Sequence, residues 1–198
     1  EGSARLEPPA CSRLYLVAAR GSLSAGADRL GPGDVLIVVQ PEPLDVTVAG
    51  LAVQVVKPQP CATGATGNRT IVRASEAPEV RWAGGAMRAH LDVGSKVSPD
   101  LYLGRLEGTA PVPEHDHPTS SETIAAIEGS GTFTLDGKEH RLGPRQVVTV
   151  PRQVRHSFRP DPGSTLVAVQ IYEPPGPEQR FLALAAADRD GGAPAPRR

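Results

Sequence analysis

Four side chains of the kinds that bind transition metals lie in the second half of the sequence. His115 and His117 are two residues apart, so a strand would point both imidazoles to one face, about 7 Å apart at Cα. Glu122 follows shortly after them, and His156 lies on a later segment. Three neutral imidazoles and one carboxylate suit one divalent ion of Fe, Mn, Ni, Cu or Zn and leave positions for substrate. The alternative is a set of polar surface histidines.

Other polar and aromatic residues are candidates for a substrate pocket around these four. Gln170 and Tyr172 share one face of an expected strand, where Gln170 would orient a ligand and Tyr172 would donate a proton. Phe158 shares the face of His156, and Tyr102 lies on the strand before the histidine pair. Glu122 is a second candidate catalytic group, as a proton acceptor. A purely structural role stays open for Gln170, and the alternative for Tyr172 is an exposed position at the end of the strand.

The segments that contain these residues are predicted to form short strands. Gly and Pro number 21 each, which excludes a long-helix bundle and favours an all-β chain with many turns. Asp136-Gly137 is a strong hairpin turn signal. The expected strands of the second half are 101–106, 121–127, 132–135, 138–142, 146–150, 156–159 and 165–172. Such a series of antiparallel strands indicates a sandwich or a jelly-roll barrel.

An internal repeat divides the chain. Arg29-Leu30-Gly31-Pro32 recurs as Arg141-Leu142-Gly143-Pro144, and in each copy a Val-rich strand, a proline and an Ala-Val-Gln strand follow. When Pro41 is aligned with Pro151, Val46 falls on His156 and Ser12 falls near Glu122, so the first copy lacks the metal ligands. The expected organisation is a degenerate β-domain at 1–60, a linker at 61–80, a metal-binding domain at 81–174, and a short helix with a disordered tail at 175–198.

The spacing of the second copy resembles the two motifs of the cupin superfamily, G-x5-HxH-x3,4-E-x6-G and G-x5-PxG-x2-H-x3-N. Gly108, the histidine pair, Glu122 and Gly129 match the first motif, and Pro151 and His156 match the second. The resemblance covers about 101–172 and implies a jelly-roll barrel that holds the metal through His115, His117, Glu122 and His156. The first copy, about 10–60, would be a degenerate half-cupin. Departures, such as Gln153 at a glycine position, affect turns rather than ligands.

Two kinds of function fit this reading. The first is a small-molecule metalloenzyme, with a dioxygenase-like reaction favoured over an isomerase or lyase. The second is a non-catalytic cupin module that binds a metal or a small molecule. The resemblance also suggests a homodimer, because family members often dimerise and because the edge strands of a half-barrel invite pairing.

Composition limits the classes of binding partner and the cellular compartment that we expect for this protein. Lys plus Arg number 21 and Asp plus Glu 22, so the chain lacks the basic excess typical of nucleic-acid binders. No apolar run approaches the roughly 20 residues of a membrane span. Cys11 and Cys61 form either a disulfide or two unrelated thiols. The two cysteines and a start at Glu1 rather than Met favour a periplasmic or secreted protein over a cytoplasmic one.

Overall fold

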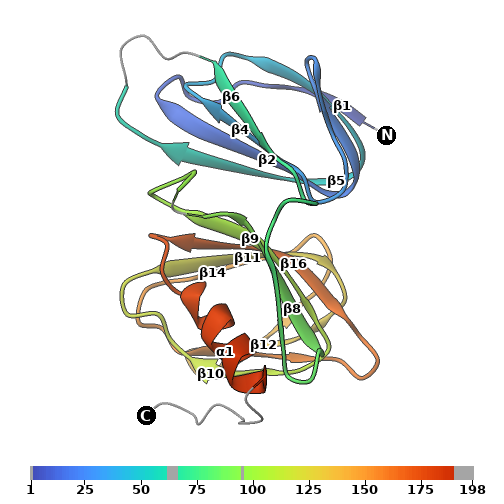
Figure 1. Cartoon of the computed structure of the whole chain (residues 1–198), viewed down its shortest axis with the longest axis vertical. Helices are drawn as coiled ribbons and strands as arrows, with labels where there is room; N and C mark the ends of the chain where they lie inside the picture. The colour runs from blue at the N-terminus through green and yellow to red at the C-terminus, as the bar shows by residue number, and fades with distance from the viewer. Residues whose placement is uncertain (1, 62–66, 95, 190–198) are drawn as a thin grey trace. The chain divides into compact units, whose positions relative to one another are not determined.

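Alternating apolar residues form strands through most of the chain (Figure 1). The computed structural model describes residues 2–61, 67–94 and 96–189, and the chain divides into two compact units, Glu1–Ala77 and Pro78–Arg198. We call these unit 1 and unit 2. The described part of the chain contains one α-helix, α1 (Gln179–Arg189), which is too short to cross a membrane. The all-β fold predicted from composition and turn signals is confirmed.

Unit 1 is one strongly bent sheet. Its strands are β1 (Gly2–Leu6), β2 (Ser12–Ala25), β3 (Asp28–Leu30), β4 (Val35–Val39), β5 (Leu44–Pro58) and β6 (Asn68–Val72). The sheet order is β1-β5-β2-β4-β6, with β3 paired to β2. The long strands β2 and β5 pair along their length, so the bend folds one half of the sheet over the other. Both halves contribute to one apolar core, which includes Leu14, Leu36, Leu23 and Leu44.

Unit 2 is built from two sheets that face each other. Its strands are β7 (Glu79–Trp82), β8 (Met87–Val93), β9 (Tyr102–Gly108), β10 (Val112–His115), β11 (Ser121–Glu128), β12 (Gly131–Leu135), β13 (Lys138–Leu142), β14 (Val147–Val150), β15 (His156–Pro160) and β16 (Leu166–Glu173). One sheet has the order β10-β15-β12-β13, and the other has the order β14-β11-β16-β9-β8-β7. Ile124 and Ala168 from the larger sheet pack with Phe133 and Phe158 from the smaller one. This arrangement is the predicted jelly roll.

The two units share one pairing pattern. In unit 1 the long strand β2 pairs with β3, β4 and β5. In unit 2 two consecutive strands take the place of β2: β11 pairs with β14 and β16, and β12 pairs with β13 and β15. β1 pairs with β5 as β10 pairs with β15. Gly21 and Gly129 mark the bend, each at a φ of 76°, and a Cβ there would overlap the carbonyl of Ala49 or Thr165, respectively. Glycine is therefore required where the chain turns from one sheet half to the other.

The repeated Arg-Leu-Gly-Pro sequence forms the same turn in both units. The amide of Gly31 donates to Asp34 Oδ2 at 3.1 Å, and the amide of Gly143 donates to Gln146 Oε1 at 2.7 Å. These turns therefore provide a common point from which residues in the two units can be matched along the paired strands.

Unit 1 differs from the expectation in one detail, and its structure decides between the two alternatives for the cysteines. The segment 61–80 was expected to be a linker, but Asn68–Val72 forms β6 on the edge of β4, and unit 1 ends at Ala77. This strand is too short and polar for a clear period-two pattern, so only pairing with β4 identifies it. Cys11 and Cys61 are joined in a disulfide, with 4.7 Å between their Cα atoms. The expected disordered tail lies largely outside the described residues.

Candidate metal centre

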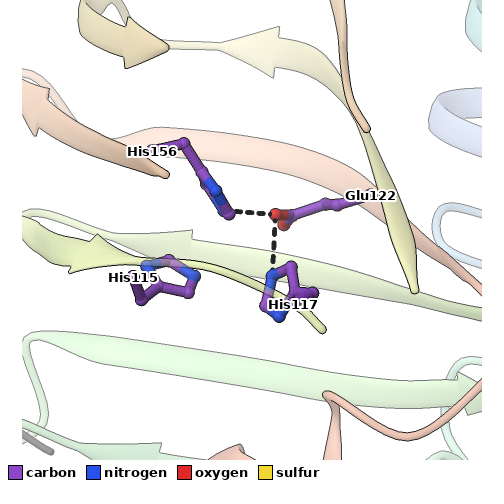
Figure 2. Close-up of side chains that lie close together, drawn as sticks. All are labelled: His115, His117, Glu122 and His156. Carbon is purple, nitrogen blue, oxygen red and sulfur yellow. Dashed lines mark hydrogen bonds and ion pairs between the residues drawn. The ribbon is translucent and has the colours of Figure 1, made fainter. Parts of the chain in front are cut away.

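The four predicted donors converge inside unit 2 (Figure 2). One ligand atom from each of His115, His117, Glu122 and His156 lies within 4.8 Å of all the others. Glu122 Oε2 is the shared point, 2.8 Å from His156 Nε2 and 3.2 Å from His117 Nε2. His117, Glu122 and His156 are buried, whereas His115 is partly exposed. The cluster is therefore nearly dry, and its side nearest solvent is at His115.

Strand pairing and one turn bring these donors together. His115 ends β10 and pairs with His156 at the start of β15, while Glu122 lies near the start of β11. His117 lies in the turn between β10 and β11, where its carbonyl accepts the amide of Gln153 at 3.0 Å. Gln153 has a φ of 64°, the left-handed conformation that glycine adopts most easily. The turn therefore has a glycine-like conformation although Gln153 stands at the glycine position of the motif.

Backbone carbonyls orient two of the imidazoles. His115 Nδ1 lies 2.8 Å from the carbonyl of Pro113, and His156 Nδ1 lies 3.0 Å from the carbonyl of Val154. A carbonyl only accepts hydrogen bonds, so Nδ1 carries the hydrogen in both rings. Nε2 then offers its lone pair to the centre of the cluster. This is how metal-binding histidines are commonly held in the correct tautomer.

The contact between His156 and Glu122 fits a cation. His156 Nε2 is buried and has no hydrogen-bond partner of suitable geometry among the described residues, although Glu122 Oε2 is 2.8 Å away. Two lone-pair atoms this close repel each other unless a proton or a metal ion lies with them. Two ligands at about 2.1 Å from one metal and at right angles are about 3 Å apart. The distances around Glu122 therefore suit a divalent ion held by these four residues.

Electrostatics keeps the carboxylate ionised. Burial disfavours the charged form of Glu122, but contacts with His117 and His156 outweigh that cost and hold its pKa well below the usual range. Burial, together with the charge of His156, lowers the pKa of His115 to about 4. Burial opposes protonation of His156 too, yet Glu122 raises its pKa. Glu122 thus keeps its negative charge among the imidazoles, as a metal-binding carboxylate must.

Gln170 and Tyr172 both contact Glu122 from β16. The amide Nε2 of Gln170 donates to Glu122 Oε1, leaving Oε2 directed at the histidines. The Tyr172 ring lies 5.1 Å from that of His117. Burial, the charges of Glu122 and Tyr102, and a hydrogen bond to Glu122 raise the pKa of Tyr172 well above its ordinary value. In the structure, then, Gln170 holds the carboxylate, and Tyr172 is a protonated phenol next to it.

Tyr102 and Phe158, the other predicted pocket residues, are buried at the edges of the cluster. The Tyr102 ring stacks on Tyr172 with 5.7 Å between centroids, one step further from the histidines. Phe158 packs in the core between the two sheets. A catalytic or substrate-binding role for these residues stays a prediction.

Sequence reasoning missed two residues that shape the surroundings. Phe133 stacks on His156 with 6.0 Å between ring centroids, and it reaches that position because β12 pairs with β15. Gly104 leaves room for the phenol of Tyr102, because a Cβ at this position would overlap it. The hairpin turn at Asp136-Gly137 was the only sequence signal that could have located Phe133.

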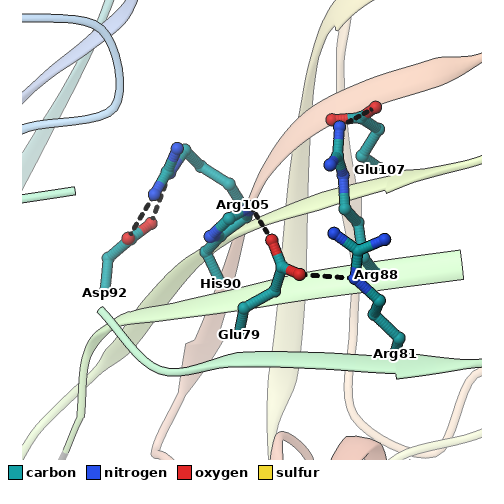
Figure 3. A network of polar contacts seen from close by, with 7 residues as sticks. All are labelled: Glu79, Arg81, Arg88, His90, Asp92, Arg105 and Glu107. Atoms are coloured by element: carbon teal, nitrogen blue, oxygen red, sulfur yellow. Dashed lines mark hydrogen bonds and ion pairs between the residues drawn. The ribbon is translucent and has the colours of Figure 1, made fainter. Parts of the chain in front are cut away.

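A second group of charged side chains lies on the opposite face of β7, β8 and β9 (Figure 3). Its members alternate along the strands with core residues; they are Glu79, Arg81, Arg88, His90, Asp92, Arg105 and Glu107. Arg105 makes two bonds of 2.9 Å to Asp92, and Arg88 pairs with Glu107. Each carboxylate of the group thus has a cationic partner. This face carries ion pairs rather than a second cluster of metal donors.

Strand register identifies the residues of unit 1 that occupy two of the donor positions. When residues are counted along the strands from the shared turn, Leu44 occupies the position of His156. Its partner Leu6 on β1 occupies the position of His115, which is the partner of His156 on β10. Leu44 is buried and belongs to the apolar core of unit 1, and Leu6 packs against that core. The expected match of Val46 with His156 is therefore wrong by two residues.

The position of Glu122 is also occupied by a leucine in unit 1. Leu14 pairs with Val38 as Glu122 pairs with Val150. The expected match with Ser12 is displaced by two residues because Pro41 follows Leu14 by 27 positions, whereas Pro151 follows Glu122 by 29. Leu14 is fully buried. The interior of unit 1 is apolar at three positions where unit 2 carries metal donors.

Comparison with known proteins identifies part of the chain directly. A family model described as a cupin domain matches residues 103–172. The chain is 38% identical over 89 residues to the tetracenomycin polyketide synthase protein TcmJ of Streptomyces glaucescens, over 43% of this chain and 58% of that protein. It is 31% identical over 91 residues to protein SchB of Streptomyces halstedii, over 45% of this chain and 66% of that protein. The chain thus matches less than two thirds of either relative.

Solved structures show the same fold over a larger part of the chain. The oxalate decarboxylase of Lactobacillus farciminis, in a formate complex, is similar with a TM-score of 0.64 and 11% identity, over 88% of this chain and 76% of that one. A putative glyoxylate induced protein from Pseudomonas aeruginosa is similar with a TM-score of 0.63 and 10% identity, over 85% and 72%. Residues 103–172, within the jelly-roll unit, thus match the cupin domain, and the solved structures show this fold over most of the chain.

Proposed function

We propose that unit 2 is a metal-dependent enzyme that acts on a small organic molecule, with a dioxygenase-like reaction favoured over an isomerase or lyase reaction. The observation that carries the proposal is the convergence of three imidazoles and one carboxylate within 4.8 Å, with His115 partly exposed. A purely structural ion is usually closed off by its protein ligands. A donor set with one side near solvent instead suits exchange of water for substrate.

The residues of the site would have separate roles in this reaction. His115, His117, Glu122 and His156 would hold the metal, which when bound supplies Lewis-acid or redox chemistry. Tyr172 keeps its proton, because burial and the charge of Glu122 raise its pKa, so it donates a hydrogen bond next to the ligands.

Gln170 would act as a positioning residue in this scheme. Its amide holds Glu122 Oε1, so the second carboxylate oxygen stays directed at His117 and His156. Tyr102, stacked on Tyr172, would fix the orientation of the phenol. Phe158 would contribute apolar lining next to His156.

One relative suggests which compounds to test first. TcmJ is named as a polyketide synthase protein, and its 38% identity over 89 residues supports a polyketide-type small molecule as substrate. Phenols represent that class, and thiols provide a second group of compounds that dioxygenases can oxidise.

Metal analysis and oxygen uptake test the proposal together. We expect the purified protein to contain about one equivalent of a transition metal and to consume O2 with at least one compound of a phenol and thiol panel. His156→Ala should lose both, whereas His140→Ala, a change of an exposed histidine on β13, should lose neither. Stoichiometric metal without turnover of any compound would favour a binding module over an enzyme. A wild-type protein that takes up no transition metal would refute the metal centre itself.

A further inference from the structure

Helix α1 packs against the edge strands of both sheets of unit 2 (Figure 1). β10 is at the edge of the smaller sheet, and β7 is at the edge of the larger one. Phe181, in the first turn of α1, belongs to an apolar cluster with Tyr172 of the larger sheet. Trp82 of β7 and Val112 of β10 pack against the same cluster. The first turn of α1 thus joins the two sheets on the side of the molecule where β10 lies.

Two contacts fix the position of Phe181. Its ring is 7% exposed and stacks on Trp82, with 5.3 Å between the centroids and 13° between the planes. Near the other end of α1, the carboxylate of Asp188 accepts the amide hydrogen of Gly84, in the turn between β7 and β8, at 3.2 Å. A helix of 11 residues is too short to be stable by itself, so these contacts keep it in place. The Phe181 ring therefore has a defined place in the interior of unit 2.

Neighbouring rings connect Phe181 to the metal centre. The Phe181 centroid lies 6.5 Å from that of Tyr172, and the Tyr172 centroid lies 5.1 Å from that of His117. On the other sheet, Val112 lies three residues before the partly exposed His115 on the same strand. Three residues of a strand span about 10 Å. A ligand of two or three fused rings that reaches the donor cluster at His115 would therefore also reach the first turn of α1.

We propose that Phe181 is a specificity residue of this site, and that it sets the upper limit on the number of fused aromatic rings in a substrate. The inference rests on the proposed function and adds a size limit to its substrate class. A phenol would bind with its oxygen toward the donor cluster and its ring beside Tyr172 and Phe181, because aromatic rings pack favourably with one another. One ring too many would overlap the Phe181 side chain, which its stacking on Trp82 prevents from moving aside.

Phenols of increasing size test this directly. Cobalt(II)-loaded full-length protein is titrated under nitrogen with phenol, 2-naphthol and 9-phenanthrol, and binding is followed by the visible absorption of cobalt. We expect the affinity of the wild type to fall about tenfold or more at one step of this series. In Phe181→Ala the first excluded phenol should bind about tenfold more tightly than in the wild type, because the missing ring leaves room for it. 2-Mercaptoethanol, a thiol too small to reach Phe181, should bind equally to both proteins.

Matched variants separate a size limit from a general loss of structure. Phe181→Leu keeps an apolar side chain and should shift the limit in the same direction by a smaller amount. Leu182→Ala, which shortens an exposed neighbour on the same helix, should behave as wild type. If Phe181→Ala does not retain cobalt, Phe181→Leu decides between the same outcomes.

The outcomes also separate this inference from the proposed function. Equal relative affinities for the three phenols in the wild type and in the Phe181 variants, with equal cobalt content, would overturn the inference and leave the metal centre intact. A wild-type protein that binds all three phenols equally well would overturn it in the same way. Failure of the wild-type protein to bind cobalt would instead overturn the proposed function and this inference with it.

Discussion

Units 1 and 2 share one strand-pairing pattern but have opposite interiors at corresponding positions. Leu6, Leu14 and Leu44 face the core of unit 1, whereas the matching positions of unit 2 carry His115, Glu122 and His156. The pairing pattern is therefore compatible with either interior. The difference teaches that the fold alone does not produce the site, which depends on a few side chains placed on it.

The two interiors have different energetic requirements. Leu14 stabilises unit 1 simply by leaving water, worth about 2 kcal/mol for a fully buried leucine. Glu122 is equally buried but costs free energy unless its charge is compensated, which Gln170, His117 and His156 achieve. A buried polar site is thus maintained only as a complete set, because removing one member leaves the others without partners.

The largest expected effect comes from giving unit 2 the interior of unit 1. The triple variant His115→Leu, Glu122→Leu and His156→Leu should lose all bound metal, measured by elemental analysis. Its metal-free form should be more stable than a variant that loses a single donor, because it keeps no unpaired buried carboxylate, although His117 and Gln170 lose their contact with Glu122.

A single change provides the control for that prediction. His156→Leu leaves Glu122 with one partner fewer and should cost about 3–5 kcal/mol in the free energy of unfolding of the metal-free protein. A triple variant that still binds metal, or that is less stable than this single variant, would contradict the comparison.

The reverse change tests unit 1. Leu14→Glu places a carboxylate where no imidazole is available, so we expect a loss of about 3–5 kcal/mol in urea unfolding and no additional bound metal. Leu14→Met controls for shape and should cost less than about 1.5 kcal/mol. A second equivalent of metal in the Glu variant would show that unit 1 has hidden donors.

The smallest effect concerns the turn that both units share. Asp34 accepts hydrogen bonds from the amides of Gly31 and Ala74 and from Arg73. Burial opposes its charged form, but these contacts outweigh burial and lower its pKa below 3.8. Asp34→Asn should therefore destabilise unit 1 by about 1–2 kcal/mol at pH 7.

The sign of the pH dependence follows from the lowered pKa. The unfolded chain binds a proton at Asp34 more readily than the folded chain, so this contribution is complete above the ordinary carboxyl range and disappears as pH falls through the folded-state pKa. The difference between wild type and Asp34→Asn should shrink below about pH 4. Gln146→Ala in the matching turn of unit 2 should cost about 1 kcal/mol at every pH. A pH-independent difference for Asp34→Asn would contradict this assignment.

Much of unit 2 could be predicted because its signals are local. The Asp136-Gly137 turn and the alternating apolar residues predicted strands close to those observed from β11 to β16. β1 and β6 of unit 1 were not predicted, since each is a short, largely polar or exposed segment that becomes a strand only by pairing with β5 or β4. Pairing partners distant in the sequence leave no local pattern.

The sequence alignment of the two units also failed where the answer depends on strand pairing. The Arg-Leu-Gly-Pro repeat and the Ala-Val-Gln strands were matched correctly, but the prolines at 41 and 151 gave a shift of two residues. Only strand register revealed Leu14 and Leu44 as the counterparts of the donors. An insertion in a turn changes the alignment of a sequence without changing the hydrogen-bond ladder.

Residue types and their spacing were enough to name the four donors and the all-β class, because imidazole and carboxylate chemistry and strand periodicity are properties of short segments. The tertiary structure decided the rest: that Nε2 atoms point at Glu122, that Gln170 and Tyr172 contact it, and that α1 packs Phe181 near Tyr172. These relations join segments far apart in the chain, and packing alone determines which of them meet.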